Sequence, residues 1–116
     1  KYDKYFDNEN IFLQKIPTSV CSSYHLAIIY FKNANVGIHK RIFDYLRSSR
    51  IGVQLHYLPV HLQPFYRNLG YKEGDFPSAE KYSQKVISLP IFPTLSKQEQ
   101  NYVISIIKDC IMRFIN

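Results

Sequence analysis

Alternation of apolar and polar residues is most regular in residues 52–58, where it predicts a β-strand. The apolar row, which we expect to be buried, consists of Val53, Leu55 and Tyr57. The opposite row consists of Gln54, His56 and Leu58. With His61 following just past the strand end, this row places proton-exchanging groups where a binding site can form. A partly exposed sheet face that simply carries polar residues explains the same pattern, so both interpretations stay open.

The remaining pattern predicts two further strands and several helices. Residues 22–31 become apolar on both faces, as in a central strand, and residues 86–92 predict a strand that Pro90 assigns to a sheet edge or stops early. Helical spacing covers residues 38–50, with Gly52 expected to end that helix or ease the next turn, and shorter helices are expected at 61–69 and 78–85. The last helix begins at Ser96, which has capping-box spacing to Glu99.

These elements predict the fold class. The first fifteen residues are expected to form a short helix or a loop, and the order after them is β-α-β-α-α-β-α. Such an order predicts an α/β (α+β) domain, in which helices cover a small, mostly antiparallel sheet. The length of 116 residues and the hydrophobic fraction of 46% fit one domain with one core.

Charge and hydropathy exclude several partners. The net charge is +6, but the densest basic group spreads over the polar half of one predicted helix, which is typical of a solvated face. That group consists of Lys40, Arg41, Arg47 and Arg50. We therefore expect no nucleic-acid partner. No apolar run has transmembrane length and no signal peptide is visible, so we expect no membrane partner and a cytoplasmic location.

Metal and hydrolytic chemistry find no support in the motifs. The cysteines, Cys21 and Cys110, lack the spacing of paired metal ligands and are expected to be free thiols. The chain has no GxSxG, HExxH or GxxxxGK[ST] motif. Of the other histidines, His39 is expected to be exposed at a helix start, and His25 to be partly buried. The candidates are therefore His56 and His61, which flank the strand end.

Five segments occur in an order and at spacings that resemble a known enzyme family. They are SSYHL at residues 22–26, RIG at 50–52, HYLPVHLQPFY at 56–66, FPSAE at 76–80 and SLPIFP at 88–93. Together they resemble the C-terminal domain of the DegT/DnrJ/EryC1/StrS sugar aminotransferases. Within that family the chain is most similar to the branch that aminates 4-keto-6-deoxy nucleotide sugars, such as the pseudaminic-acid and perosamine enzymes.

The resemblance implies a domain organisation and a reaction. Residues 1–21 would be a connecting segment and residues 22–116 the small C-terminal domain of a fold-type I aminotransferase, whose large pyridoxal-phosphate-binding domain is absent from this chain. The full-length enzyme, a homodimer, would use pyridoxal phosphate to transfer an amino group, with glutamate as the expected donor, to a keto sugar attached to a nucleotide. The products of such enzymes enter surface polysaccharides or glycans.

The resemblance also implies site residues. His56 matches the family position in the His-Tyr-x-Pro segment and is the first candidate to face the cofactor or sugar, followed by His61 and Gln63. No lysine lies in the family's Schiff-base motif, so we expect no catalytic residue, no bound cofactor and no activity in this segment alone.

The chain begins with Lys1 rather than Met, from which we expect a fragment of a longer protein. Two other interpretations remain open. The first is that the chain is a truncated, non-catalytic remnant that acts only as a folded or interaction module. A small basic nucleic-acid binder is the poorest alternative, because clustered aromatics on a basic sheet face would be expected and are not evident.

Overall fold

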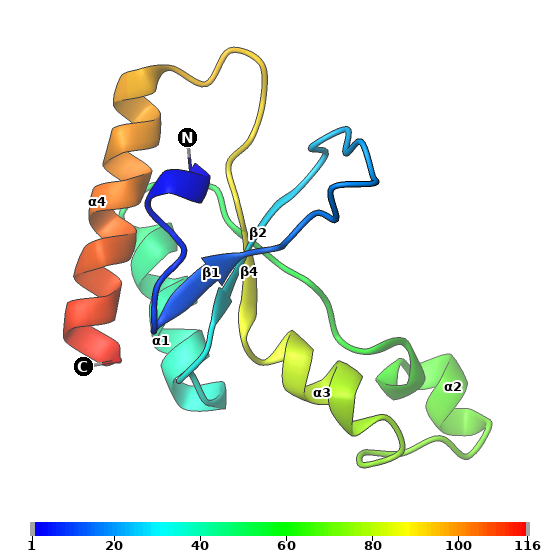
Figure 1. Cartoon of the computed structure of the whole chain (residues 1–116). Coiled ribbons are helices and arrows are strands. Elements are labelled where there is room, and N and C mark those ends of the chain that lie inside the picture. Colours follow the sequence, from blue (N-terminus) through cyan, green and yellow to red (C-terminus); the bar gives the residue numbers. More distant parts are fainter. Residues whose placement is uncertain (1, 116) are drawn as a thin grey trace.

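A four-stranded antiparallel sheet forms the centre of the computed structural model, which describes residues 2–115 (Figure 1). Its strands, in chain order, are β1 (Ile11–Leu13), β2 (Ala27–Phe31), β3 (Gln54–Leu55) and β4 (Val86–Leu89). Their spatial order is β1-β2-β4-β3, and every neighbouring pair is antiparallel. The predicted fold class, a small antiparallel sheet with helices, is confirmed.

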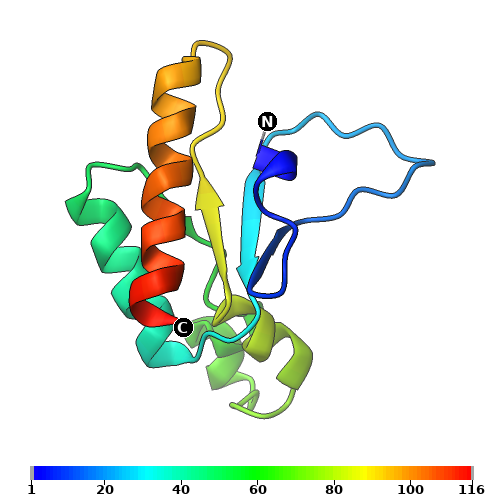
Figure 2. The same cartoon turned by 60° about the vertical axis from the view of Figure 1, so that its left-hand side comes forward.

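Two long helices cover one side of this sheet, whereas the short helices of residues 60–83 gather at one end of it (Figures 1 and 2). The long helices are α1 (Val36–Ser48) and α4 (Lys97–Phe114), which lie side by side. The short helical elements are η1 (Tyr2–Lys4), η2 (Val60–Leu62), α2 (Pro64–Asn68) and α3 (Pro77–Ser83). Residues 60–83, which contain η2, α2 and α3, are called the α2–α3 lobe below.

The core lies between the sheet and the two long helices. Ile29 and Phe31 of β2, Ile42 and Leu46 of α1, and Ile107 of α4 are all 0% exposed. On β2 these apolar residues alternate with half-buried ones, as one face of a strand requires. Burial of this shared apolar surface is the main force that holds the helices on the sheet.

Local hydrogen bonds fix where α4 begins. The Ser96 hydroxyl accepts from the Glu99 backbone N–H at 3.1 Å, and the Glu99 carboxylate accepts from the Ser96 backbone N–H at 2.8 Å. The predicted capping box is therefore confirmed.

Helix α1 begins and ends earlier than predicted. It begins at Val36 because the Asn35 side chain accepts from the Ile38 backbone N–H at 2.9 Å, which makes Asn35 the N-cap. It ends before Arg50, which adopts the left-handed conformation with φ 60°. The Ile51 N–H then bonds back to the Leu46 carbonyl at 3.0 Å, as in a Schellman motif. Gly52, the predicted stop, lies beyond this motif.

The N-terminal segment contributes a strand that the sequence pattern did not predict. β1 pairs with β2, with Ile11 opposite Phe31. Tyr2, Phe6 and Ile11 are 5%, 0% and 0% exposed and belong to the same core as the later elements. A strand of three residues is too short to show an alternating pattern, which is why this segment was expected to be a helix or loop.

The strand expected at residues 22–31 begins only at Ala27. Residues 14–26 form a long loop that extends away from the sheet (Figure 2). Within it, Tyr24 has φ 50° and its N–H bonds to the Ser22 hydroxyl at 3.1 Å, so the chain turns there instead of extending. His25 lies in this loop and is exposed, so its predicted partial burial was wrong. The predicted central position of β2 is confirmed.

The strand expected at residues 52–58 is shorter than predicted and consists of Gln54 and Leu55 only. Val53 is 1% exposed as predicted, but Leu55 is 42% and Tyr57 69% exposed, so the predicted apolar row was wrong beyond Val53. The physical reason is position, because β3 lies at the sheet edge and the chain leaves the sheet at His56.

Of the two alternatives expected from Pro90, the early stop is the one that β4 shows. β4 stops before Pro90, as expected, but it lies inside the sheet between β2 and β3 and not at an edge. All four of its residues are buried.

Both cysteines are free thiols, as predicted. Cys21 is exposed and Cys110 is buried. Within residues 2–115, no helix combines the length and the apolar character that crossing a bilayer requires.

Candidate functional site

His56 lies where the chain leaves β3, and it is only 8% exposed. Its Nε2 shares a hydrogen bond with the hydroxyl of Ser88 on the neighbouring strand β4, and its ring meets the Tyr57 ring edge-on at 4.5 Å. Burial lowers the pKa of His56, because a charged imidazolium loses its water there. The first candidate residue is thus a buried histidine with a neutral partner, and not a side chain on an open face.

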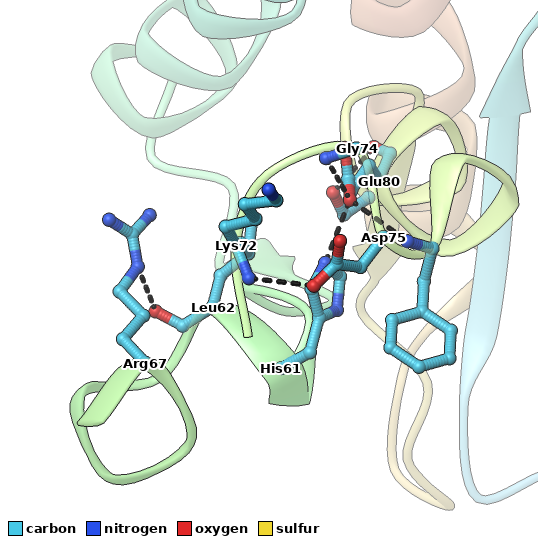
Figure 3. A network of polar contacts seen from close by, with 9 residues as sticks. His61, Leu62, Arg67, Lys72, Gly74, Asp75 and Glu80 are labelled. Carbon is cyan, nitrogen blue, oxygen red and sulfur yellow. Dashed lines mark hydrogen bonds and ion pairs between the residues drawn. The ribbon is translucent and has the colours of Figure 1, made fainter. Parts of the chain in front are cut away.

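His61 lies on η2 at the base of the α2–α3 lobe and is 7% exposed. Its Nε2 is 2.7 Å from Oε1 of Glu80, which comes from α3 (Figure 3). The pair joins the two ends of the lobe, which are 19 residues apart in the chain. The second candidate is therefore anchored by a charged partner.

Glu80 is the centre of this polar network, and sequence reasoning assigned it no role. Oε1 accepts from the backbone N–H groups of Gly74 at 2.9 Å and Phe76 at 3.3 Å, and Oε2 accepts from Gly74 at 3.1 Å. Burial raises the pKa of Glu80, but the hydrogen bonds from His61, Gly74 and Phe76 lower it more, so the net pKa lies below its ordinary value. The carboxylate is thus held in its ionised form.

A sequence signal for Glu80 does exist. Gly74 has φ +94°, a conformation that favours glycine and lets the loop fold back over the start of α3. Pro77 opens α3, and a Glu in the first helical turn can reach the free N–H groups that precede the helix. Only the distance to His61 could not be inferred from this local pattern.

Gln63, the third candidate, lies apart from the His61–Glu80 pair. It is exposed, and its side-chain amide donates to the Leu58 carbonyl at a long 3.4 Å. Other short contacts shape the lobe, as Figure 3 shows: Arg67 Nε donates to the Leu62 carbonyl at 2.9 Å, and the Lys72 N–H donates to Asp75 at 2.9 Å. The structure therefore brings together His61 and Glu80 and leaves Gln63 exposed, outside this pair.

A cavity of about 350 Å³, called the aromatic cavity below, opens beside His61. Its lining residues are Val60, His61, Tyr66, Tyr71, Phe76 and Ala79. Successive rings are in contact, with centroid distances of 4.8 Å for His61–Phe76, 6.1 Å for Phe76–Tyr71 and 6.3 Å for Tyr71–Tyr66. A largely apolar cavity with a few polar side chains is typical of a small-molecule site. His56 and Gln63 are not among its lining residues.

The aromatic cavity lacks groups that pyridoxal phosphate needs. That cofactor needs a lysine for covalent attachment and an acidic partner for its ring nitrogen. No lysine lines the aromatic cavity. A larger cavity of about 620 Å³, between the N-terminal segment and the loop of residues 14–26, is lined by Lys15, but that lysine is exposed. Within residues 2–115, no cluster of three His, Cys, Asp or Glu residues could hold a metal ion.

Comparison with known proteins places this domain in a family. The model of the DegT/DnrJ/EryC1/StrS aminotransferase family matches residues 2–108. The spore coat polysaccharide biosynthesis protein SpsC of Bacillus subtilis is 32% identical over 92 residues, which cover 77% of this chain and 24% of SpsC.

Two solved structures share the fold closely. Spr1654 of Streptococcus pneumoniae, described as a sugar aminotransferase and solved in its PMP form, superposes with a TM-score of 0.92 at 30% identity, over 98% of this chain and 29% of its own. PseC of Helicobacter pylori, an aminotransferase of pseudaminic-acid biosynthesis, superposes with a TM-score of 0.83 at 25% identity, over 97% and 30%. This chain therefore spans less than a third of these relatives. It belongs to the DegT/DnrJ/EryC1/StrS family of pyridoxal-phosphate-dependent sugar aminotransferases.

Proposed function

We propose that this chain is the C-terminal domain of a nucleotide-sugar aminotransferase that uses pyridoxal phosphate. The enzyme transfers an amino group from glutamate to a 4-keto-6-deoxy sugar nucleotide for surface polysaccharide or glycan biosynthesis. The observation that carries the proposal is the match of nearly the whole chain to Spr1654. The named roles of SpsC, in spore coat polysaccharide biosynthesis, and of PseC, in pseudaminic-acid biosynthesis, support the polysaccharide and glycan part of it.

In this proposal, the lysine that binds the cofactor belongs to the large domain; the support is that no lysine lines the aromatic cavity of the described residues. When bound, pyridoxal phosphate supplies the electron sink that amino transfer requires. This domain supplies a wall of the active site, with His56, His61 and Gln63 toward the cofactor and the sugar. The full-length enzyme is a cytoplasmic homodimer.

Absorbance and activity measurements test this proposal. The purified 116-residue chain is expected to show no visible absorbance from lysine-bound pyridoxal phosphate and no amino transfer. The full-length enzyme is expected to show both, with glutamate as donor and nucleotide-linked 4-keto-6-deoxy sugars as acceptors. Cofactor binding by the chain alone would contradict the assignment of the lysine to the large domain. A full-length protein without activity would favour the non-catalytic remnant.

A further inference from the structure

We propose that Glu80 is a positioning residue, which fixes the His61 ring so that Nδ1 faces the ligand as a hydrogen-bond acceptor. The group that His61 binds is then a neutral donor, such as a sugar hydroxyl. The inference rests on the proposed function in one respect, namely that the ligand of the aromatic cavity is part of the sugar nucleotide.

The first step concerns which ring nitrogen carries the proton. Glu80 Oε1 lies 2.7 Å from His61 Nε2, and both side chains are almost fully buried, at 12% and 7% exposed. An ionised carboxylate can only accept hydrogen bonds, so Nε2 must carry the hydrogen. In a neutral imidazole the other nitrogen, Nδ1, is then the acceptor.

The second step concerns how firmly Glu80 itself is held. Its two oxygens accept three hydrogen bonds from the backbone N–H groups of Gly74 and Phe76. Backbone donors at a turn and a helix start do not rotate as side chains do, so the carboxylate has one orientation. A carboxylate that holds one ring nitrogen fixes both the tautomer and the ring plane of a histidine.

The third step concerns what an Nδ1 acceptor selects. His61 lines the aromatic cavity, whose other lining residues are apolar or aromatic and include two tyrosines, Tyr66 and Tyr71. A hydroxyl or N–H of the ligand would donate to Nδ1, whereas a carboxylate or carbonyl oxygen would face a second acceptor and be rejected. The aromatic rings would cover the apolar side of the same ligand. A hydroxyl-bearing sugar combines both properties.

The tautomer can be measured directly by NMR of ¹⁵N-labelled histidine side chains in the 116-residue chain. The His61 ring is expected to carry a hydrogen on Nε2, which faces Glu80, and none on Nδ1. His39 is an internal reference, since its Nε2 lies 3.0 Å from the Val86 carbonyl, which also only accepts. A His61 ring with hydrogen on Nδ1, alone or on both nitrogens, would overturn the proposal without any variant being made.

A pair of matched variants tests the role of Glu80. In Glu80→Gln, the carboxylate charge is lost and one amide N–H must face the Gly74 N–H or the His61 ring, so the His61 signals should change. Glu73→Gln makes the same chemical change at an exposed position of the same lobe and should leave His61 as it is. His39 should be unaffected in both. Unchanged His61 signals in Glu80→Gln would overturn the proposal.

Kinetics of the full-length enzyme separate positioning from folding. Glu80→Gln should raise KM for the sugar nucleotide about fivefold, equivalent to one hydrogen bond of ~1 kcal/mol, with a smaller change in kcat. Glu80→Asp should restore part of this loss, and Glu73→Gln should match the wild type. An unchanged KM in Glu80→Gln would overturn the proposal about Glu80. Amino transfer by the wild-type enzyme would, in that case, still support the proposed function. An inactive wild type would remove the proposed function, and the NMR result would still decide the tautomer.

Discussion

Two buried histidines of the site differ in the charge of their partners. His61 faces the Glu80 carboxylate, whereas His56 faces the Ser88 hydroxyl and has a pKa lowered by burial. In the folded chain His56 is therefore neutral at a pH where the unfolded chain already binds a proton. The stability that His56 contributes is fully present above its ordinary pKa of 6.5 and is lost as the pH falls toward the lower, folded value.

Replacement of His56 should reveal this contribution. The His56→Ala chain is expected to lose about 1–3 kcal/mol of unfolding free energy near neutral pH, because the buried Ser88 hydroxyl loses its partner. Its stability should also fall less steeply than that of the wild type as the pH is lowered from about 7.5 to 5.5. Urea denaturation at several pH values measures both. His25→Ala, an exposed control, should behave as the wild type, and parallel pH profiles for all three would contradict the assignment.

The partners of these histidines explain what the sequence could not predict at this scale. His56 and His61 could be singled out because they flank a strand end. Their partners lie 32 and 19 residues away, and no local pattern connects them. His39 shows the same limit: it was predicted to be exposed, but its ring is 8% exposed and reaches the Val86 carbonyl, 47 residues away.

Among the elements, α4 was predictable because its determinants are local. The cap and the first-turn Glu99 are three residues apart, and apolar residues recur at helical spacing in Val103, Ile107 and Cys110, all buried. The short strands β1 and β3 have no such determinants. They exist because β2 and β4 offer free backbone groups beside them, which is a tertiary property.

The N-cap of α4 gives a prediction for one element. Ser96→Ala should lower the unfolding free energy by about 1 kcal/mol, because the Glu99 N–H loses its acceptor. Thermal or urea denaturation measures the change. Ser105→Ala, in the exposed middle of the same helix, is the matched control and should change stability by less than about 0.5 kcal/mol. Equal losses for the two variants would argue against a role of the cap.

The end of α1 gives a prediction of the opposite sign. Arg50 has φ 60°, where a side chain is strained, so Arg50→Gly should raise the unfolding free energy by about 0.5–1 kcal/mol. Arg47→Gly removes the same side chain from the last turn of the regular helix and should lower it by about 1 kcal/mol. Denaturation curves of both variants measure these two changes in unfolding free energy. A destabilised Arg50→Gly chain would show that the arginine side chain outweighs the backbone strain.

For the whole molecule, the N-terminal segment determines where the domain begins. Tyr2, Phe6 and Ile11 are buried in the common core, and each buried apolar side chain contributes about 1.5–3 kcal/mol. Together they approach the total stability of a typical domain, about 5–15 kcal/mol. Removal of residues 1–13 is therefore expected to abolish cooperative unfolding, as circular dichroism during heating would show.

Point variants of the same segment provide the control. Asp3→Ala and Lys4→Ala change exposed side chains there and should leave the melting transition in place. A truncated chain that still melts cooperatively would favour the boundary near residue 22 that the family resemblance implied. The family match itself begins at residue 2.

The order of strands in the sheet has a consequence for protein synthesis. Among the described strands, β3 pairs only with β4, and β4 is both the last strand in the chain and an inner strand of the sheet. While the ribosome makes the chain, the edges of β2 and β3 that pair with β4 therefore remain unpaired until residues 86–89 have emerged from the exit tunnel. Unpaired edges are sites of aggregation. The nascent chain is thus most prone to aggregation after β3 has emerged and before β4 has emerged. We expect chaperone binding to matter most in this interval.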